Sequence, residues 1–236
     1  MRRTLLVLAV LATIALSASP AAARTIHWSG QAWDVENSAG AVGPGPNHFS
    51  DDTRNVWVDG RGRLHVAITH RAGGWQCAEI SSAHASGFGT YRFRVEGDAE
   101  TLDPNIVLGL FTWDNSPGEH HRELDIEWSR WGDASDQKTA GFTVQPYQHA
   151  GNRHRYLQPS AAPVSDQVFT WRPASVAFGA YAVPGAEISR WTYRGPDVPA
   201  PGKAHVHLNF WLFRGDPPTN AQPAEIVIRS FTFRPA

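Results

Sequence analysis

Three acidic residues, Glu123, Asp125 and Glu127, occupy alternate positions in the segment HHRELDIEWSRWGD, residues 120–133. On a β-strand, successive side chains point to opposite faces, so the three carboxyl groups would share one face, and Leu124 and Ile126 the other. Carboxylates so close together raise one another's pKa, so at least one is expected to hold a proton near neutral pH. A protonated acid beside an ionised carboxylate is the pair that cleavage of a glycosidic bond requires.

The spacing of the outer two acids also suits this chemistry. Four positions along a strand separate the Cα atoms by about 13 Å, and side chains that lean together bring their carboxyl groups to roughly 5–7 Å, which overlaps the separation in retaining glycosidases. Two other interpretations stay open. The acids can form the solvated face of an antiparallel strand. Alternatively, His121, which has the same parity, can join them in binding a divalent metal ion.

The elements that position these acids are predicted to be β-strands. Alternating or β-branched segments recur along the chain at 55–59, 63–69, 89–97, 105–113, 122–129, 141–147, 167–171, 175–181, 188–193, 205–213 and 225–233. Short strands separated by Gly, Pro and Asp predict an all-β protein built as an antiparallel β-sandwich. The turn DGRG at 59–62 predicts a hairpin. The proline-containing segments 150–166 and 195–203 are expected to be surface loops, which often border a binding site.

Composition limits the class of protein. Residues 1–23 combine two arginines, a short apolar run and a small-residue end, which predicts a signal peptide followed by one domain at 24–236. We therefore expect a secreted or periplasmic protein without a membrane anchor, and a monomer. A formal net charge of −1 argues against nucleic acid as a partner. The single cysteine, Cys77, excludes an internal disulfide, and the ten tryptophans offer flat faces on which sugar rings can stack.

The segment RELDIEWS closely resembles the signature of glycoside hydrolase family 16, in which an acid, an aspartate and a second acid alternate with aliphatic residues before an aromatic one. Other segments resemble that family in the expected order: AEISSAHASGFGTYRFRV, VLGLFTW, VQPYQHAG, FTWRPASVAF and HVHLNFWLF, which together span about residues 50–215. The resemblance implies a concanavalin A-like jelly roll and a retaining β-glucanase activity, with a polysaccharide as substrate. It departs from the family at His121, where many members have tryptophan.

The resemblance also implies a role for each acid: Glu123 as the nucleophile, Asp125 as the group that orients and tunes it, and Glu127 as the general acid and base. Residues implied to face the cleft and bind the substrate are Glu79, Trp113, His121, Gln145, Tyr147, Asn209 and Trp211. No cofactor is implied. Some family members bind a structural calcium ion, for which FSDD at 49–52 is the one candidate segment here.

The substrate is less well defined by the sequence. Arg122 and Arg130 have even parity and are expected to point away from the acids, which favours a neutral glucan over a sulfated or acidic one. Three alternatives to a hydrolase remain: a non-catalytic, lectin-like carbohydrate-binding module, a transglycosylase that uses the same residues, and a non-catalytic structural protein of the cell envelope.

Overall fold

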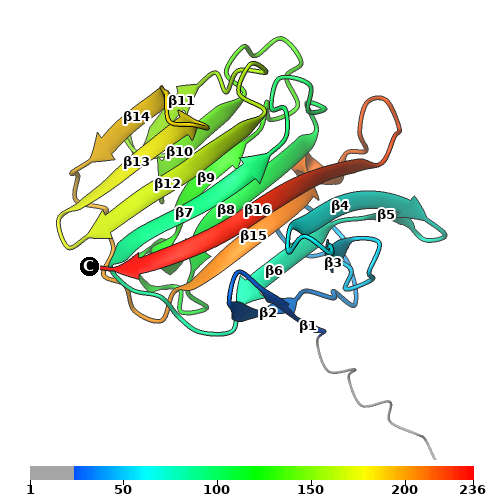
Figure 1. The fold of residues 1–236 in the computed structure, drawn as a ribbon, viewed down its shortest axis with the longest axis horizontal. Helices are drawn as coiled ribbons and strands as arrows, with labels where there is room; N and C mark the ends of the chain where they lie inside the picture. The colour runs from blue at the N-terminus through cyan, green and yellow to red at the C-terminus, as the bar shows by residue number, and fades with distance from the viewer. Residues whose placement is uncertain (1–23) are drawn as a thin grey trace, which may run out of the picture.

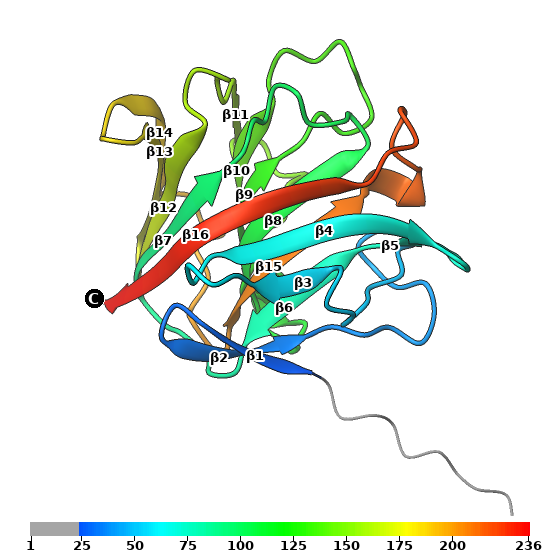
Figure 2. The ribbon, with the colours of Figure 1, turned by 45° about the vertical axis from the view of Figure 1, so that its right-hand side comes forward.

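The computed structural model describes residues 24–236, so the predicted signal peptide at 1–23 lies outside the described residues. The described chain forms two sheets packed face to face, and every pair of neighbouring strands within them is antiparallel. Figure 1 looks onto the sheet that contains β7, β12 and β16, with the other sheet behind it, and Figure 2 shows the two layers from the side. The predicted antiparallel β-sandwich is confirmed.

The first sheet contains, in spatial order, β1 (Thr25–Trp28), β2 (Gln31–Val35), β6 (Ala78–Ser82), β15 (His205–Leu212), β8 (Ile106–Trp113), β9 (Leu124–Trp128), β10 (Ala140–Val144) and β11 (Arg153–Tyr156). The second contains β14 (Glu187–Tyr193), β13 (Ser175–Ala182), β12 (Val164–Arg172), β7 (Gly89–Glu96), β16 (Ala224–Pro235), β4 (Leu64–Arg71) and β3 (Val56–Val58), and β5 (Gly74–Gln76) pairs with β4. The helical turns of the described chain are η1 (Gly118–Arg122) and η2 (Phe213–Gly215).

The hydrophobic core fills the space between the sheets. Its largest fully buried side chains are aromatic or aliphatic: Trp33, Trp128, Trp171, Tyr91, Phe49, Phe93, Phe142, Phe169, Phe178, Phe210, Leu64 and Ile68. In β9, Leu124, Ile126 and Trp128 are completely buried, as their parity predicted. Truncating side chains of this size in a close-packed core costs about 2–5 kcal/mol each, so the core fixes the rotation of β9 about its own axis.

Two sequence predictions about connections have different outcomes. The hairpin at 59–62 is confirmed, because β3 and β4 pair across it. The prediction that 150–166 is entirely loop is wrong, because Arg153–Tyr156 forms β11 and pairs with β10. Its alternating pattern was hidden by the arginines and by the neighbouring Gly and Pro residues. Tyr156 shows why the strand forms, since its ring is buried and packs 4.8 Å from the ring of Phe142.

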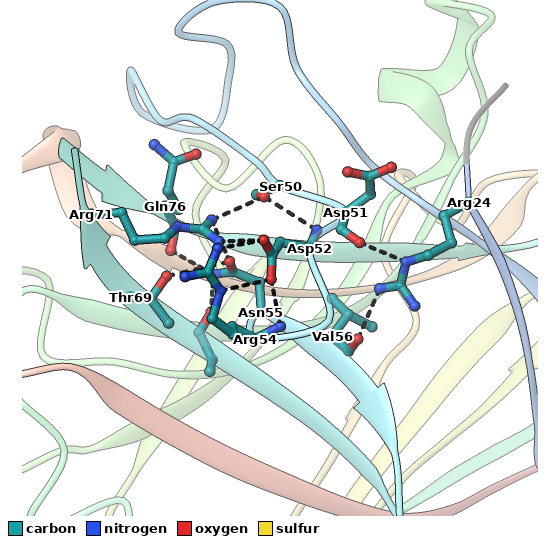
Figure 3. A network of polar contacts seen from close by, with 11 residues as sticks. Arg24, Ser50, Asp51, Asp52, Arg54, Asn55, Val56, Thr69, Arg71 and Gln76 are labelled. Carbon is teal, nitrogen blue, oxygen red and sulfur yellow. Dashed lines mark hydrogen bonds and ion pairs between the residues drawn. The ribbon is translucent and has the colours of Figure 1, made fainter. Parts of the chain in front are cut away.

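A polar network ties the start of the described chain to the β4–β5 hairpin (Figure 3). Asn55 lies at its centre and is completely buried. Its Nδ2 donates to the carbonyl oxygens of Ala67 and Gln76, at 2.8 and 2.9 Å, and its Oδ1 accepts from Arg71 at 2.6 Å. Arg24 donates to the backbone oxygen of Asp51 at 2.5 Å, which fastens the N-terminal segment to the same loop.

This network includes the candidate calcium segment at 49–52. Both carboxylate oxygens of Asp52 accept from the guanidinium of Arg54, and Arg71 forms a 2.9 Å ion pair with the same carboxylate. Hydrogen bonds from Arg54 are the largest cause of the lowered pKa of Asp52. Two guanidinium groups thus supply the positive charge that a metal ion would bring. Calcium binding at this segment stays a prediction.

Replacing Asn55 with alanine is expected to lower the free energy of unfolding by about 2–4 kcal/mol, because the change leaves two buried carbonyl groups without their side-chain donor and removes one of the acceptors of Arg71. Urea denaturation followed by tryptophan fluorescence measures the loss. Asn37→Ala, at an exposed position, is the matched control and should change stability by less than about 0.5 kcal/mol. Equal midpoints for the two variants would contradict the role assigned to Asn55.

Candidate active site

Strand register brings the acidic residues into line, across β8, with polar residues of β15 and β6. Opposed residues of antiparallel strands place their side chains on the same face. Glu127 lies opposite Gly109 of β8, which lies opposite Asn209 of β15, which in turn lies opposite Glu79 of β6. In the same way, Asp125 lies opposite Phe111 of β8, which lies opposite His207 of β15, and these residues form a second row beside the first. The face of the first sheet that points away from the core is therefore lined with carboxyl, amide and imidazole groups.

A cleft of about 500 Å³ opens on this face. Its lining residues are Glu36, Gly43, Pro44, Glu79, Gly109, Phe111, Trp113, Asn115, Glu123, Asp125, Glu127, His207, Asn209 and Trp211. They include all three acids of the motif and four of the seven residues predicted to bind substrate. The cleft is a deep, open groove of the size that ligand sites usually have.

The three remaining residues lie beside the cleft without lining it. His121 stacks flat on Trp113, with ring centroids 4.0 Å apart, and its Nδ1 lies 2.9 Å from the carbonyl oxygen of Asp114. Gln145 donates to Oδ2 of Asp125 at 3.0 Å, so it acts on the site through that carboxyl group. Tyr147 is 50% exposed, and the guanidinium of Arg153 lies 5.3 Å from the centre of its ring.

His121 departs from its expected position for a backbone reason. The prediction assumed that the strand alternation extends back through residue 121, but β9 begins at Leu124 and η1 precedes it. The imidazole therefore supports Trp113 instead of joining the acids. Within residues 24–236 there is no group of three or more His, Cys, Asp or Glu side chains arranged to hold a metal ion.

Burial and mutual repulsion set the protonation of the acids. Burial is the largest cause of the raised pKa of Glu123, to about 8, and the charge of Glu127 adds to it, whereas a hydrogen bond from Asp125 opposes the shift. Burial also raises the pKa values of Asp125 and Glu127 well above their usual range. The hydrogen bond between Asp125 and Glu123 raises the pKa of Asp125, so Asp125 holds the proton. Glu123 accepts this hydrogen bond, which favours its ionised form.

Glycine at position 109 makes room for the side chain of Asn209. A Cβ at residue 109 would overlap Oδ1 of Asn209. With no side chain there, the carboxamide of Asn209 lies over the backbone of β8, and its Nδ2 donates to Glu79 at 3.3 Å. His207 lies 3.0 Å from the other oxygen of Glu79 through its Nδ1. Any larger residue at 109 would displace the carboxamide and disturb this arrangement.

Sequence reasoning missed two residues that line the cleft, His207 and Glu36, and two arginines that act on Glu127 from outside the lining. His207 and Asn209 are two positions apart in one strand, so the same alternation that placed Asn209 could have found His207. Glu36 directly follows β2, a strand that sequence reasoning did not identify. Arg153 and Arg155 belong to β11, which was mistaken for a loop; the charges of both lower the pKa of Glu127.

The backbone that leads into Glu123 has an unusual conformation. Glu119, His120, His121 and Arg122 have positive φ angles of 51°, 51°, 61° and 56°, which lie in the left-handed region. For residues with a Cβ this region costs about 1–2 kcal/mol each. Strain of this kind persists only where the surrounding structure imposes it.

Contacts with β8 hold this left-handed turn in place. The hydroxyl of Thr112 donates to the carbonyl oxygen of Arg122 at 2.8 Å and accepts from the backbone N–H of Leu124 at 3.2 Å. The guanidinium of Arg122 forms a 3.3 Å ion pair with Asp114, whose backbone N–H donates to the carbonyl oxygen of His121 at 2.7 Å. Together these bonds fix the backbone on both sides of Glu123.

The loop before β15 also forms hydrogen bonds to the residues that hold this turn. The backbone N–H of Ala200 donates to Oε2 of Glu119 at 2.6 Å, and that of Lys203 donates to Oδ2 of Asp114 at 2.9 Å. The segment 195–203 was predicted to be a surface loop, and its residues form no strand or helix. Through its bonds to Glu119 and Asp114, the backbone of this loop helps to hold the turn that places Glu123.

Comparisons with known proteins add information on the fold. A scan against protein-family models finds no match, and a search of curated proteins finds none either. Among solved structures, a β-1,3-1,4-glucanase (lichenase) from a mouse hindgut metagenome has a TM-score of 0.66 at 20% identity, covering 89% of this chain and 96% of its own. The β-glucanase of Bacillus licheniformis has a TM-score of 0.63 at 16% identity, covering 86% and 92%.

A third similar structure, from Mycobacterium tuberculosis, is described as an immunostimulatory antigen and pseudo β-1,3-glucanase. It has a TM-score of 0.65 at 21% identity, covering 86% of this chain and 91% of its own. At identities this low, the similarity establishes a shared fold and leaves the reaction open. The glucanase-type jelly roll expected from the sequence is the fold of this protein.

Replacing His120 with glycine is expected to raise the free energy of unfolding by up to about 1 kcal/mol, because glycine adopts a positive φ without the penalty that a Cβ imposes. His27→Gly is the matched control: His27 is also exposed but lies in β1, so the same change should lower stability by about 0.5–1 kcal/mol. Chemical denaturation measures both. Destabilisation of similar size at the two positions would show that the turn is not strained.

Replacing Glu123 with glutamine is expected to flatten the dependence of stability on pH. In the wild-type protein the unfolded carboxyl ionises near 4.5, whereas the folded one ionises near 8. The stability that protonated Glu123 contributes is therefore complete below pH 4.5 and is lost as the pH rises to 8. Because Glu123→Gln cannot ionise, its stability should fall less steeply across this window.

Denaturation at a series of pH values tests this expectation. Asp125 and Glu127 titrate in the same direction, so the variant should keep a reduced slope rather than none. Glu187→Gln, an exposed change on β14, should follow the wild-type curve. Parallel curves for Glu123→Gln and wild type would rule out a raised pKa at this residue.

Proposed function

We propose that this protein is a glycoside hydrolase that cleaves internal β-linkages of a polysaccharide with retention of configuration. The observation that carries the proposal is the row of three acids on the floor of an open cleft, with Asp125 buried, Glu123 and Glu127 partly buried, and the pKa values of all three raised. A structural or lectin-like sandwich has no need for acids held in this way, because their burial costs stability.

Each acid has a role that its environment suits. Glu123, whose ionised form is favoured by the hydrogen bond from Asp125, is the nucleophile. Asp125 donates a hydrogen bond to Glu123 and is itself held by Gln145, so it orients the nucleophile and lowers its pKa. Glu127, whose pKa burial raises well above its usual range, carries the proton that a general acid must donate.

The reaction then follows a double displacement. Glu123 attacks the anomeric carbon while Glu127 gives its proton to the glycosidic oxygen, so the bond to the leaving sugar breaks and a covalent glycosyl ester forms on Glu123. In the second step Glu127 takes a proton from a water molecule, whose oxygen attacks the anomeric carbon and releases Glu123. Two inversions give net retention.

Aromatic side chains of the cleft suit the binding of sugar rings. Trp113, stiffened by the stacked His121, and Trp211, whose ring meets Trp131 at 61° with centroids 6.3 Å apart, both line the cleft with their faces braced by neighbours. Rigid aromatic faces lose little entropy when a ring stacks on them. Glu79 and Asn209 supply the polar groups that sugar hydroxyls require.

We further propose membership of glycoside hydrolase family 16, with a β-glucan as the substrate class. The ordered motifs in the sequence support this, and so does the fold shared with proteins described as β-glucanases. Export through the segment 1–23 remains part of the same proposal, since a polysaccharide substrate lies outside the cell.

A non-catalytic carbohydrate-binding function is the second candidate. It is favoured by one observation, the similarity to a protein described as a pseudo β-1,3-glucanase. The two candidates predict different results in one assay, because a binding protein would retain glycans without releasing new reducing ends. A transglycosylase would form longer and shorter chains without a net gain of reducing ends, because a sugar hydroxyl takes the place of water in the second step, and mass analysis detects these products.

Glu123→Ala is expected to reduce turnover by several orders of magnitude while leaving the fold intact, because the variant lacks the group that attacks the anomeric carbon. The substrates to assay with wild type and variant are laminarin, lichenan, xyloglucan, agarose and carrageenan, with product mass analysis. Azide should restore activity to the variant by taking the place of the carboxylate, giving a glycosyl azide of inverted configuration.

Glu187→Ala on β14 is the control and should retain full activity, because its side chain is exposed and outside the cleft. Circular dichroism checks the fold of both variants. Turnover of a responsive glycan by Glu123→Ala at the wild-type rate would refute the assignment of the nucleophile.

A further inference from the structure

A second group of acids lies at the end of the cleft formed by β2, β6 and β15. Glu36 directly follows β2, and its backbone N–H donates to the carbonyl oxygen of Glu79 at 3.0 Å. The side chains of Glu36 and Glu79 both line the cleft. Neither belongs to the catalytic motif, so the mechanism above gives Glu36 no function.

The negative charge at this end is poorly compensated. Within residues 24–236, Glu36 forms no ion pair, whereas Glu79 has one, with His207. Burial and the charge of Glu79 raise the pKa of Glu36, and His207 opposes the shift. The residues that line the cleft in the described chain include no lysine or arginine. Two carboxyl groups therefore share a single imidazole, and the missing positive charge can come from a ligand.

An unsatisfied acceptor lies beside these acids. The side chain of Asn209 is only 3% exposed, and its Oδ1 has no hydrogen-bond partner in the described structure. Its Nδ2 is engaged with Glu79, so the carboxamide is held in one orientation, with Oδ1 over the bare backbone of Gly109 on the cleft floor. A buried acceptor without a donor costs about 1–3 kcal/mol. A ligand that brings a donor would recover that cost.

We propose that this end of the cleft binds a sugar unit that carries a protonated amino group, so that the substrate contains glucosamine-type units. The inference rests on the proposed cleavage of a β-linked polysaccharide, and it replaces some or all of the neutral glucose units of a β-glucan with units that carry an amino group. An ammonium group has three N–H donors and a positive charge, which match the carboxylates of Glu36 and Glu79, and a neighbouring hydroxyl of the same sugar donates to Oδ1 of Asn209.

Other ligand classes fit this group of residues less well. A neutral sugar supplies hydroxyl donors but leaves the charge of the two carboxylates unbalanced. A sulfated or acidic sugar would add a like charge, which is repelled. The site is also too poor in ligating side chains for a metal ion, since residues 24–236 hold no suitable group of three.

Binding measurements on Glu123→Ala test the inference without requiring turnover. Three β-1,4-linked hexasaccharides differ only at C2: oligomers of glucosamine, of N-acetylglucosamine and of glucose. Isothermal titration calorimetry, at a pH where the amine is protonated, should show the glucosamine oligomer binding at least about tenfold more tightly than the other two, since a hydrogen bond to a charged group contributes about 1.5–3 kcal/mol. Added salt should reduce this preference.

Second-site variants in the same background locate the effect. Glu36→Gln should abolish the preference for the glucosamine oligomer, and Glu187→Gln, a matched loss of charge outside the cleft, should retain it. Equal affinity for the three oligomers, a preference that survives Glu36→Gln, or failure to bind any of them would each overturn the inference.

The outcomes also separate the inference from the proposed function. Selective binding of the glucosamine oligomer, combined with no hydrolysis of any glycan by the wild-type protein, would reject the hydrolase and keep the amino-sugar site. Hydrolysis of neutral glucans by the wild-type protein, without selective binding by the variant, would reject the amino-sugar site and keep the hydrolase.

Discussion

The clustering of three carboxyl groups along one extended segment, residues 123–127, is the constraint on which the rest of the structure depends. Repulsion and desolvation would drive Glu123, Asp125 and Glu127 towards water, so the strand that carries them must be held against that force. Its opposite face supplies the hold, because Ile126 and Trp128 are completely buried in the core. The alternation of a single five-residue strand thus couples the stability of the sandwich to the placement of its acids.

The backbone next to the acids is also held in a strained conformation. The left-handed turn before β9 stores strain immediately beside the proposed nucleophile, and Thr112, Asp114 and the 195–203 loop hold it in place. A loop that the sequence indicates only as a surface connection therefore helps to position the proposed nucleophile. The polar network around Asn55 has a similar effect at the β4–β5 hairpin, where buried hydrogen bonds tie the loop before β3 to the second sheet.

Alternation in the sequence was enough to predict the sandwich, the shared face of the acids and the core side of β9, since a period of two is a property of each strand alone. Long-range features were harder to predict. His121 does not lie on its expected face, because the residue types at 119–122 do not predict four successive positive φ angles. Arg155 was missed because charged side chains concealed β11, and Glu36 because strand order across a sheet cannot be read from one segment.

The register around Glu127 has a further consequence. Its two cross-strand neighbours, Gly109 and Gly141, have no side chains, and residues of the next strands fill that space: the carboxamide of Asn209 lies over Gly109 and the guanidinium arm of Arg155 over Gly141. The charge of Arg155 opposes the rise in the pKa of Glu127. In the proposed reaction the leaving oxygen and the attacking water lie on the same side of the anomeric carbon, so one position of Glu127 serves both. The two glycines thereby determine which polar side chains flank the proposed general acid.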